Sequence, residues 1–210
     1  MKLYDMVKAP NPRRVRIFLA EKGIEIERVE VDIPGGGNLT PGYLAMNPRG
    51  VVPTLLLDDG SVLDESVAIC RYFEMLHPEP NLMGRGALET AQIESWQRRM
   101  EFDGLFAVAS AFRNEAEPFA NRSMPGALPG LPAIPALAER GRALTAHFFE
   151  MLNGRLGASE FVAGDRYTIA DISAHVTIDF ARWIRMRVPE GHTHTQRWYA
   201  AVSSRPSAKA

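Results

Sequence analysis

The stretch "GVVPTLLL", residues 50 to 57, places a proline directly before an apolar run that is typical of a buried strand. Proline cannot donate a hydrogen bond to a strand ladder, so Pro53 belongs at a strand start, an edge or a bulge. A cis bond between Val52 and Pro53 is one arrangement that would turn a neighbouring backbone edge outward. Such an edge can pair with an extended ligand through its N–H and C=O groups.

Glu65 and Ser66 stand at the start of a predicted helix, "ESVAICRYFEML". The first N–H groups of a helix have no partners within it, and the helix dipole adds positive potential there, so this position favours an anion. Ser66 can hold an anionic group with its hydroxyl and its N–H. A simpler role is open to Glu65, because a carboxylate also complements the helix dipole.

The elements that must position these residues alternate between strand and helix over residues 1 to 77. In the first helix, Asn11 suits the N-cap, Pro12 suits the first helical position and Gly23 suits the stop. An Asp-Gly pair indicates a hairpin between two apolar runs. The order β-α-β-α-β-β-α follows from a strand at "KLYD", the first helix, a strand over 24–33, a helical piece over 41–46, the hairpin over 54–64 and a helix over 65–76.

The rest of the chain is helical in its apolar period. Residues 77 to 86 have the composition of a linker, and a Pro- and Gly-rich loop runs from about Pro118 to Pro135. Thr168 with Asp171 three residues later is a capping-box variant, which favours a structural role for Asp171. We expect helices over 87–113, 136–156, from Thr168 to about 184, and 195–206.

Composition narrows the class of protein. The 210 residues carry a formal net charge of −1 with no run of like charges, which argues against general binding to nucleic acid or a membrane surface. No apolar segment approaches the ~20 residues of a membrane span, and the first residues lack the apolar centre of a secretory signal. A single cysteine, Cys70, excludes an internal disulfide or a multi-cysteine metal site, and core packing suits it. We expect a soluble cytoplasmic protein.

Three segments, "NPRGVVPTL", "DESVAI" and "FVAGDRYTIADI", stand in an order that resembles the glutathione transferase family over essentially the whole chain. The resemblance implies a thioredoxin-like glutathione-binding domain over residues 1–78. It also implies an all-helical domain over residues 86–210 that forms the electrophile site and dimer contacts. Glutathione would be the co-substrate of a cytoplasmic, homodimeric detoxification enzyme that needs no metal.

The resemblance also implies roles for individual residues. The N–H and C=O of Val52 would pair with the cysteinyl unit of glutathione beside a cis Pro53. Ser66 would hold the γ-glutamyl carboxylate and Glu65 the γ-glutamyl ammonium. For the glycyl carboxylate, spacing points to Asn38, and Arg49 is a nearby cation with a similar claim. Asn38 is equally a loop residue that tolerates a left-handed backbone.

The chain departs from the family pattern where the thiol must be activated. A free thiol is mostly un-ionised at neutral pH, so the enzyme needs a donor beside the sulfur. Ala9 stands where many serine-type members carry serine, and Tyr4 lies within a predicted strand. Asn11 remains: its oxygen would cap the helix while its NH₂ group points at the thiolate. Backbone N–H groups of Ala9, Arg13 and Arg14 are the alternatives.

The second substrate is expected between the two domains. Met6 and Val7 from the first loop, with Phe102 and Phe106 one helical turn apart, are candidate walls. The first hypothesis is therefore a transferase that conjugates glutathione to small apolar electrophiles. A glutathione-dependent isomerase, lyase or peroxidase stays open, as does a non-catalytic binding protein of the same fold, which the alanine at position 9 would suit.

Overall fold

Four short strands form one mixed sheet in the first third of the chain. Its order is β2-β1-β3-β4, in which β1 pairs parallel with β2 and antiparallel with β3, and β3 pairs antiparallel with β4. The computed structural model describes residues 1–128 and 130–210, so Pro129 of the predicted Pro- and Gly-rich loop lies outside the described residues. The strands are β1 (Lys2–Asp5), β2 (Glu27–Glu30), β3 (Thr54–Leu56) and β4 (Val62–Asp64).

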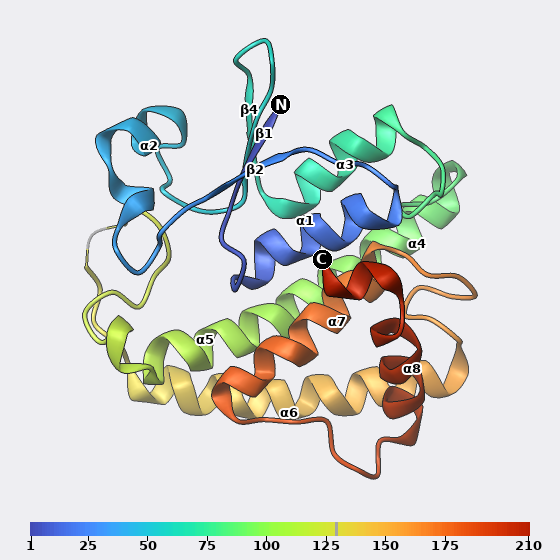
Figure 1. Cartoon of the computed structure of the whole chain (residues 1–210). Helices are drawn as coiled ribbons and strands as arrows, with labels where there is room; N and C mark the ends of the chain where they lie inside the picture. Colours follow the sequence, from blue (N-terminus) through green and yellow to red (C-terminus); the bar gives the residue numbers. More distant parts are fainter. Residues whose placement is uncertain (129) are drawn as a thin grey trace.

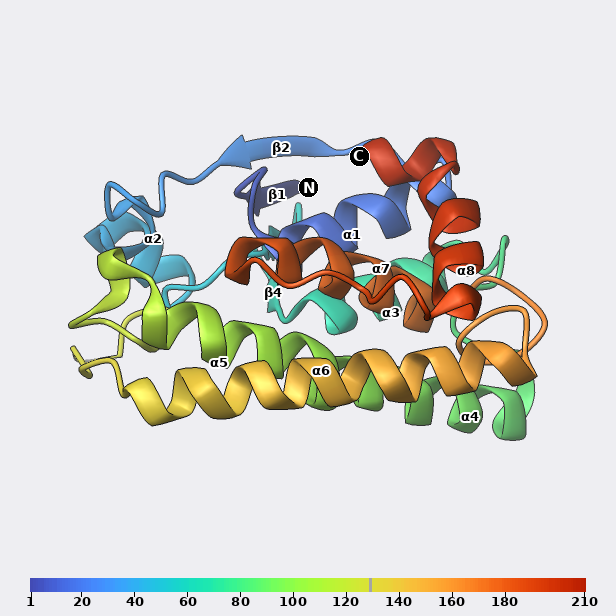
Figure 2. The same cartoon turned by 90° about the horizontal axis from the view of Figure 1, so that it is seen from below.

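Two helices cover the face of the sheet that is turned toward the helical half of the molecule. These are α1 (Pro10–Glu21) and α3 (Ser66–Leu76), which pack against each other, while α2 (Pro41–Met46) follows a short turn, η1 (Gly37–Leu39). Figure 2 shows α1 lying between the sheet and α7. The predicted β-α-β-α-β-β-α order is confirmed. The strand predicted over 24–33 is shorter, because β2 is an edge strand whose only neighbour, β1, has four residues.

The second half is helical throughout the part that the structure describes (Figure 1). The helix predicted over 87–113 is a continuous rod, but a π-helical turn interrupts its α-helical hydrogen bonding. Within the described ranges, no helix is both long and apolar enough to cross a membrane. The elements are α4 (Gly86–Arg99), the π-turn η2 (Met100–Leu105), α5 (Phe106–Glu115), η3 (Glu117–Phe119), α6 (Pro135–Ala158), α7 (Ile169–Ala181), η4 (Arg182–Ile184), α8 (Thr193–Ser203) and η5 (Pro206–Lys209).

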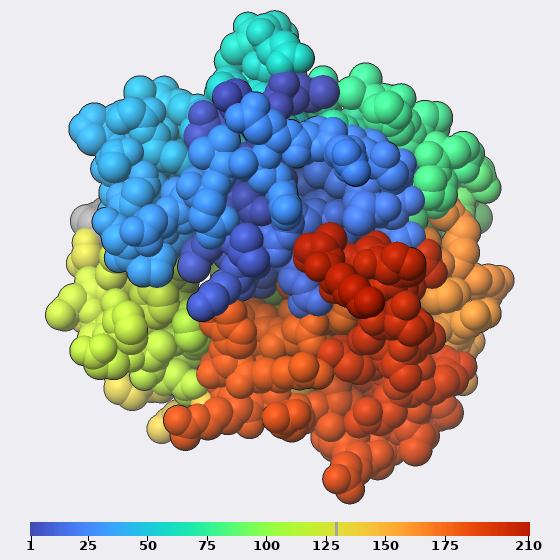
Figure 3. All heavy atoms as spheres, viewed as in Figure 1, coloured from blue at the N-terminus to red at the C-terminus, as the bar shows by residue number. Residues whose placement is uncertain are grey.

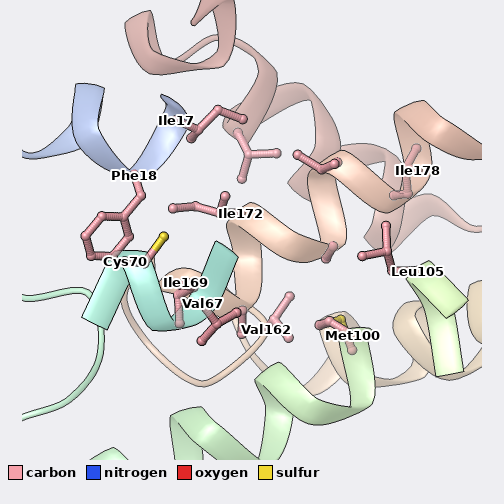
Figure 4. Close-up of a cluster of buried hydrophobic side chains, with 14 of the residues drawn as sticks. Ile17, Phe18, Val67, Cys70, Met100, Leu105, Val162, Ile169, Ile172 and Ile178 are labelled. Carbon is pink, nitrogen blue, oxygen red and sulfur yellow. The ribbon is translucent and has the colours of Figure 1, made fainter. Parts of the chain in front are cut away.

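A single apolar core crosses from the sheet-containing half into the helical half (Figure 4). Phe18 of α1, Cys70 of α3 and Ile172 of α7 all belong to it and are fully buried. Cys70 therefore packs in the core, as predicted, and burial raises the pKa of its thiol to about 12. Because one core serves both halves, α1 is held firmly against α7.

The start of α7 is fixed by the buried carboxylate of Asp171. It accepts hydrogen bonds from the Thr168 N–H at 2.9 Å and the Thr168 hydroxyl at 3.1 Å, which is the carboxylate half of the predicted capping box. The same carboxylate accepts from the Val162 N–H and from Nε1 of Trp198, each at 2.9 Å. Four donors satisfy this buried anion, so its role is to join α7, α8 and the loop before α7.

Candidate functional site

The segment before β3 presents an unpaired backbone edge. The Val52–Pro53 peptide bond is cis, as predicted. The carbonyl oxygen of Val51 accepts from the Tyr43 hydroxyl at 2.6 Å and the Thr54 hydroxyl at 3.1 Å, which anchors the segment. The N–H and C=O of half-buried Val52 make no hydrogen bond within residues 1–128 and 130–210. They remain available to an extended ligand.

Helix α3 begins beside this edge in an unusual backbone conformation. Glu65 is its N-cap residue and has φ = +65°, a value that non-glycine residues seldom adopt without support from their surroundings. The Glu65 side chain is exposed and pairs with Nη1 of Arg49 at 2.5 Å. Ser66 follows as the first helical residue, and its buried hydroxyl accepts from Nη1 of Arg14 at 3.0 Å.

The start of α1 differs from the prediction. The N-cap is Ala9, which has no capping side chain, and Pro10 is the first helical residue. Asn11 is therefore the second residue of the helix, and its predicted capping role is wrong. Proline fixes φ at a helical value, so Pro10 starts the helix two residues earlier than Pro12 would.

The sequence Pro-Asn-Pro leaves few hydrogen-bond donors in this first turn. Proline has no N–H. The Ala9 N–H donates to the Met6 carbonyl at 2.9 Å, and the Arg13 N–H donates to the Ala9 carbonyl at 3.2 Å. These two N–H groups, which were predicted as alternative donors to the thiolate, therefore already have acceptors in the protein. Asn11 is exposed, and within the described residues neither its N–H nor its NH₂ group has a partner.

Arg14 connects the start of α1 with the start of α3 from the buried side of the candidate site. Its guanidinium is buried, with the side chain 2% exposed, and Nη1 donates to Asn11 Oδ1 at 3.2 Å and to Ser66 Oγ at 3.0 Å. Because an amide is planar, fixing Oδ1 on the buried side directs the NH₂ group of Asn11 outward.

The remaining donors of Arg14 are also satisfied, by residues of the helical half. Nε donates to Ser173 Oγ at 3.0 Å, and Nη2 donates to Glu101 Oε1 at 2.6 Å. In the amide orientation that satisfies both of its ends, Gln97 also accepts from Nη2 at 2.6 Å. A buried guanidinium with every N–H paired is rigid, so it holds Asn11 and Ser66 in fixed relation.

Arg14 was not predicted as a site residue, although the sequence carries a signal for it. Arg14 lies three residues after Asn11 and four before Phe18, so all three share one face of α1. A charged residue on an apolar face requires buried partners. Their identity depends on the packing of α1 against η2 and α7, which no local pattern reveals.

The two residues predicted for a glycyl carboxylate are both engaged elsewhere. Asn38 is 2% exposed, and its Nδ2 donates to the Gly50 carbonyl at 2.6 Å. This bond holds the loop before Val52, while the contact of Asn38 with a glycyl carboxylate stays a prediction. Arg49 pairs with both Asp64 and Glu65, and the hydrogen bond with Glu65 raises the pKa of its guanidinium.

The predicted walls of the second-substrate site lie on two elements. The rings of Phe102 and Phe106 are 6.3 Å apart between centroids and are 60% and 64% exposed. Val7 is exposed in the loop between β1 and α1, and Met6 beside it is half-buried. Figure 3 shows that loop (dark blue) meeting yellow-green segments near residue 115 and orange segments near residue 180.

Comparison with known proteins identifies the family. Residues 9–76 match the model of the glutathione S-transferase N-terminal domain, and residues 120–206 match that of the C-terminal domain. The chain is 32% identical to glutathione S-transferase 2 of Saccharomyces cerevisiae over 219 aligned residues, which cover 100% of this chain and 88% of the yeast protein. The chain belongs to the glutathione transferase family. Its thioredoxin-like first domain and helical second domain are those of the family's fold.

Solved structures agree with this assignment. A glutathione S-transferase domain-containing protein from Marinobacter aquaeolei VT8 superposes with a TM-score of 0.91 at 34% identity, covering 99% of each chain. A maleylacetoacetate isomerase of Pseudomonas aeruginosa is 40% identical over 94 residues, which are 44% of this chain and 44% of the isomerase. The proteins similar to this chain therefore carry the names of more than one reaction. The reaction of this chain must be argued from its site.

Proposed function

We propose that this protein conjugates the thiolate of glutathione to small apolar electrophiles. Residues 1–78 bind glutathione in this proposal, and residues 86–210 supply the electrophile site. The observation that carries the proposal is the position of Arg14, whose Nη1 reaches both Asn11 and Ser66. One buried cation thereby couples the residue proposed to meet the sulfur with the residue proposed to meet the γ-glutamyl carboxylate.

Glutathione binds along three adjoining elements in this scheme. Val52 pairs its N–H and C=O with the cysteinyl unit. Ser66 and the first N–H groups of α3 hold the γ-glutamyl carboxylate, where the helix dipole favours an anion. Glu65 takes the γ-glutamyl ammonium in place of Arg49, its present partner.

Asn11 supplies the donor that the missing serine would have provided. Its NH₂ group and its N–H face solvent at the positive end of α1, so both can donate to a sulfur anion. A hydrogen bond to the charged form lowers the pKa of the thiol. The thiolate then uses an electron pair to form a C–S bond, and the leaving group departs with the electron pair of the bond that breaks.

The proposal is tested with purified protein, glutathione and chlorodinitrobenzene, with the thioether product followed by its absorbance. We expect turnover that saturates in glutathione and rises with pH as the bound thiol ionises. If calorimetry shows bound glutathione but no product forms, the protein is a non-catalytic binder of the same fold. If glutathione does not bind, the protein is neither a glutathione transferase nor a glutathione-binding protein.

We also propose that the protein is a homodimer, with α4 contributing to the interface. Leu88 of α4 is 73% exposed, and Met75 of α3 is 78% exposed. Apolar side chains this open to solvent suit burial against a second copy. Sedimentation at micromolar protein should give twice the mass of the chain, and a monomer under these conditions would contradict the proposal.

A further inference from the structure

Two arginines, Arg113 in α5 and Arg122 in the loop after η3, have no side-chain acceptor among the residues that the structure describes. Arg113 is half-buried, and its Cζ lies 4.7 Å from the ring centroid of Phe119. Neither Arg113 nor Arg122, which is also half-buried, makes a side-chain hydrogen bond or an ion pair within the described residues. By contrast, Arg142 on the adjacent α6 is paired with Glu115 through two hydrogen bonds of 2.9 Å.

The unpaired state of these cations costs free energy. Burial and the neighbouring charge of Arg122 lower the pKa of the Arg113 guanidinium to about 10. The ring of Phe119 stabilises Arg113 in part, and a cation that loses water and faces a like charge is stabilised further when an anion joins it. The chain places an aromatic ring against Arg113 and no carboxylate within the described residues, so an anion that pairs with Arg113 would come from a ligand.

Arg113 lies on the helix that carries Phe106, and Arg122 lies on a loop that contacts the sheet-containing domain. Arg113 follows Phe106 by seven residues, or about two turns of α5, so the two side chains leave the same side of the helix. The loop that carries Arg122 reaches the other domain, since the Ala127 N–H donates to the Arg49 carbonyl at 2.8 Å.

A glycine permits this approach. Gly126 has φ = +79°, and a Cβ atom there would overlap the carbonyl oxygen of Arg49. The loop is thereby fastened three residues before Val52. Figure 1 shows it, in yellow-green, beside α2. The loop that carries Arg122 thus contacts the segment before Val52, and Arg113 shares a side of α5 with the exposed ring of Phe106.

We infer that Arg113 and Arg122 bind a carboxylate of the second substrate, so that the preferred electrophile is an apolar or aromatic molecule carrying one carboxylate. This inference rests on the proposed function. A guanidinium matches a carboxylate through two parallel hydrogen bonds, and such bonds are stronger than those between neutral groups. Phe119, whose ring lies against Arg113, and Phe106, about two turns earlier on α5, suit the flat body of such a molecule.

The test compares two probes that differ in one substituent, a chlorodinitrobenzoate with its carboxylate and the corresponding chlorodinitrobenzamide with an uncharged amide. The parent protein should prefer the benzoate by about tenfold in kcat/KM, the scale of one hydrogen-bonded charge. Arg113→Met and Arg122→Met should each bring the ratio close to that of the uncatalysed reaction. Arg140→Met, at an exposed position on α6, is the matched control and should retain the parent ratio.

A second measurement does not depend on turnover. Calorimetry of the two purified glutathione conjugates should show tighter binding of the carboxylate form to the parent and not to Arg113→Met. If this difference appears without any turnover, the inference stands and the proposed function falls. If both binding and kcat/KM ratios are unchanged in the two variants, the inference is overturned.

Two further outcomes would also overturn it. A raised KM for glutathione, with the probe ratio unchanged, would mean that the arginines hold the glycyl carboxylate. A raised pKa of the bound thiol, with both probes slowed equally, would mean that Arg113 acts on the sulfur. Circular dichroism of each variant establishes that the fold is intact before either result is interpreted.

Discussion

Nη1 of Arg14 lies 3.2 Å from Oδ1 of Asn11, so a guanidinium buried between the two domains orients an amide at the surface. The amide cannot rotate to present its oxygen to a ligand without breaking this bond. A ligand anion at the start of α1 therefore meets hydrogen-bond donors. The Asn11 oxygen therefore accepts from Arg14, where the sequence pattern predicted that it would cap the helix.

Asn11→Asp should separate orientation from donation. Aspartate keeps an oxygen for Arg14 but removes the NH₂ donor and adds a negative charge beside the sulfur. We expect the melting temperature to stay near that of the parent, the pKa of bound glutathione thiol to rise, and turnover to slow by about 10²-fold, the scale of one lost anion-stabilising donor. The thiolate absorbance against pH gives the pKa, with the parent protein as reference.

Asn11→Ala is the companion variant. It removes the NH₂ donor without adding a charge, so its thiol pKa should lie between those of the parent and Asn11→Asp. It also leaves Arg14 with one acceptor fewer, at a cost of ~1 kcal/mol in the free energy of unfolding. A thiol titration identical to the parent in both variants would limit Asn11 to the role of partner for Arg14.

Ser66→Ala should weaken glutathione binding by ~1–3 kcal/mol, because it removes one ligand contact and one acceptor of the buried Arg14. The measurement is the dissociation constant of glutathione by calorimetry. Ser61→Ala, at an exposed position in the hairpin between β3 and β4, is the matched control and should bind as the parent does. Equal affinity for the two variants, with both folded, would remove Ser66 from the site.

Asp171→Asn should lower the free energy of unfolding by about 3 kcal/mol, since an amide presents an NH₂ group to some of the four donors that converge there. Urea unfolding measures the change. Asp165→Asn, on an exposed residue six positions earlier, should change stability little. Near-parent stability in Asp171→Asn would show that the buried charge is not needed to join α7 and α8.

His175 makes stability depend on pH. It is 2% exposed, Nδ1 has no partner among the described residues, and burial lowers its pKa from 6.5 to about 4. Asp179, whose Oδ2 lies 3.4 Å from Nε2, opposes this shift, while Arg13 and Arg182 add to it. In the unfolded chain the imidazole takes up a proton more readily. The contribution is therefore fully present above pH 6.5 and is lost as the pH falls toward 4.

The pH effect is measured by urea unfolding at pH 7 and pH 5. His175 should account for a loss of about 2 kcal/mol in the free energy of unfolding between these values. In His175→Gln this part of the loss should vanish, whatever the variant's stability at pH 7. His147→Gln, at an exposed position on α6, should keep the parent's dependence. If His175→Gln keeps it too, the proton is taken up elsewhere.

Local chemistry was enough to predict most elements and the backbone part of the site. Pro53, the Asp-Gly hairpin and the pair Thr168 and Asp171 each carry a short-range signal that the structure bears out. The predicted start of α1 was two residues too late, because Pro10 and Pro12 both suit a first helical position and a local pattern cannot choose between them. The burial of Asn38 was not predictable from local sequence, because its hydrogen-bond acceptor, the Gly50 carbonyl, lies twelve residues away.

Long-range partners explain what sequence patterns could not supply. Arg14 meets Ser66, Glu101 and Ser173 only because three helices converge on α1. Among the described residues no acceptor lies beside the Arg113 side chain, and only the three-dimensional structure can reveal that a charged group lacks a partner. The π-helical turn η2 likewise has no propensity signal, although it sets the position of Glu101.

The shared core also has a consequence for synthesis on the ribosome. The apolar faces of α1 and α3 emerge early, but their partner α7 (Ile169–Ala181) emerges near the end of the chain. At translation rates of about 5–20 residues per second, α7 is made on the order of ten seconds after the helices whose apolar side chains it covers, among them Ile17, Phe18 and Val67. During this interval the nascent chain exposes an apolar surface of the kind that chaperones bind, so the yield of native protein depends on how soon the last third of the chain is made.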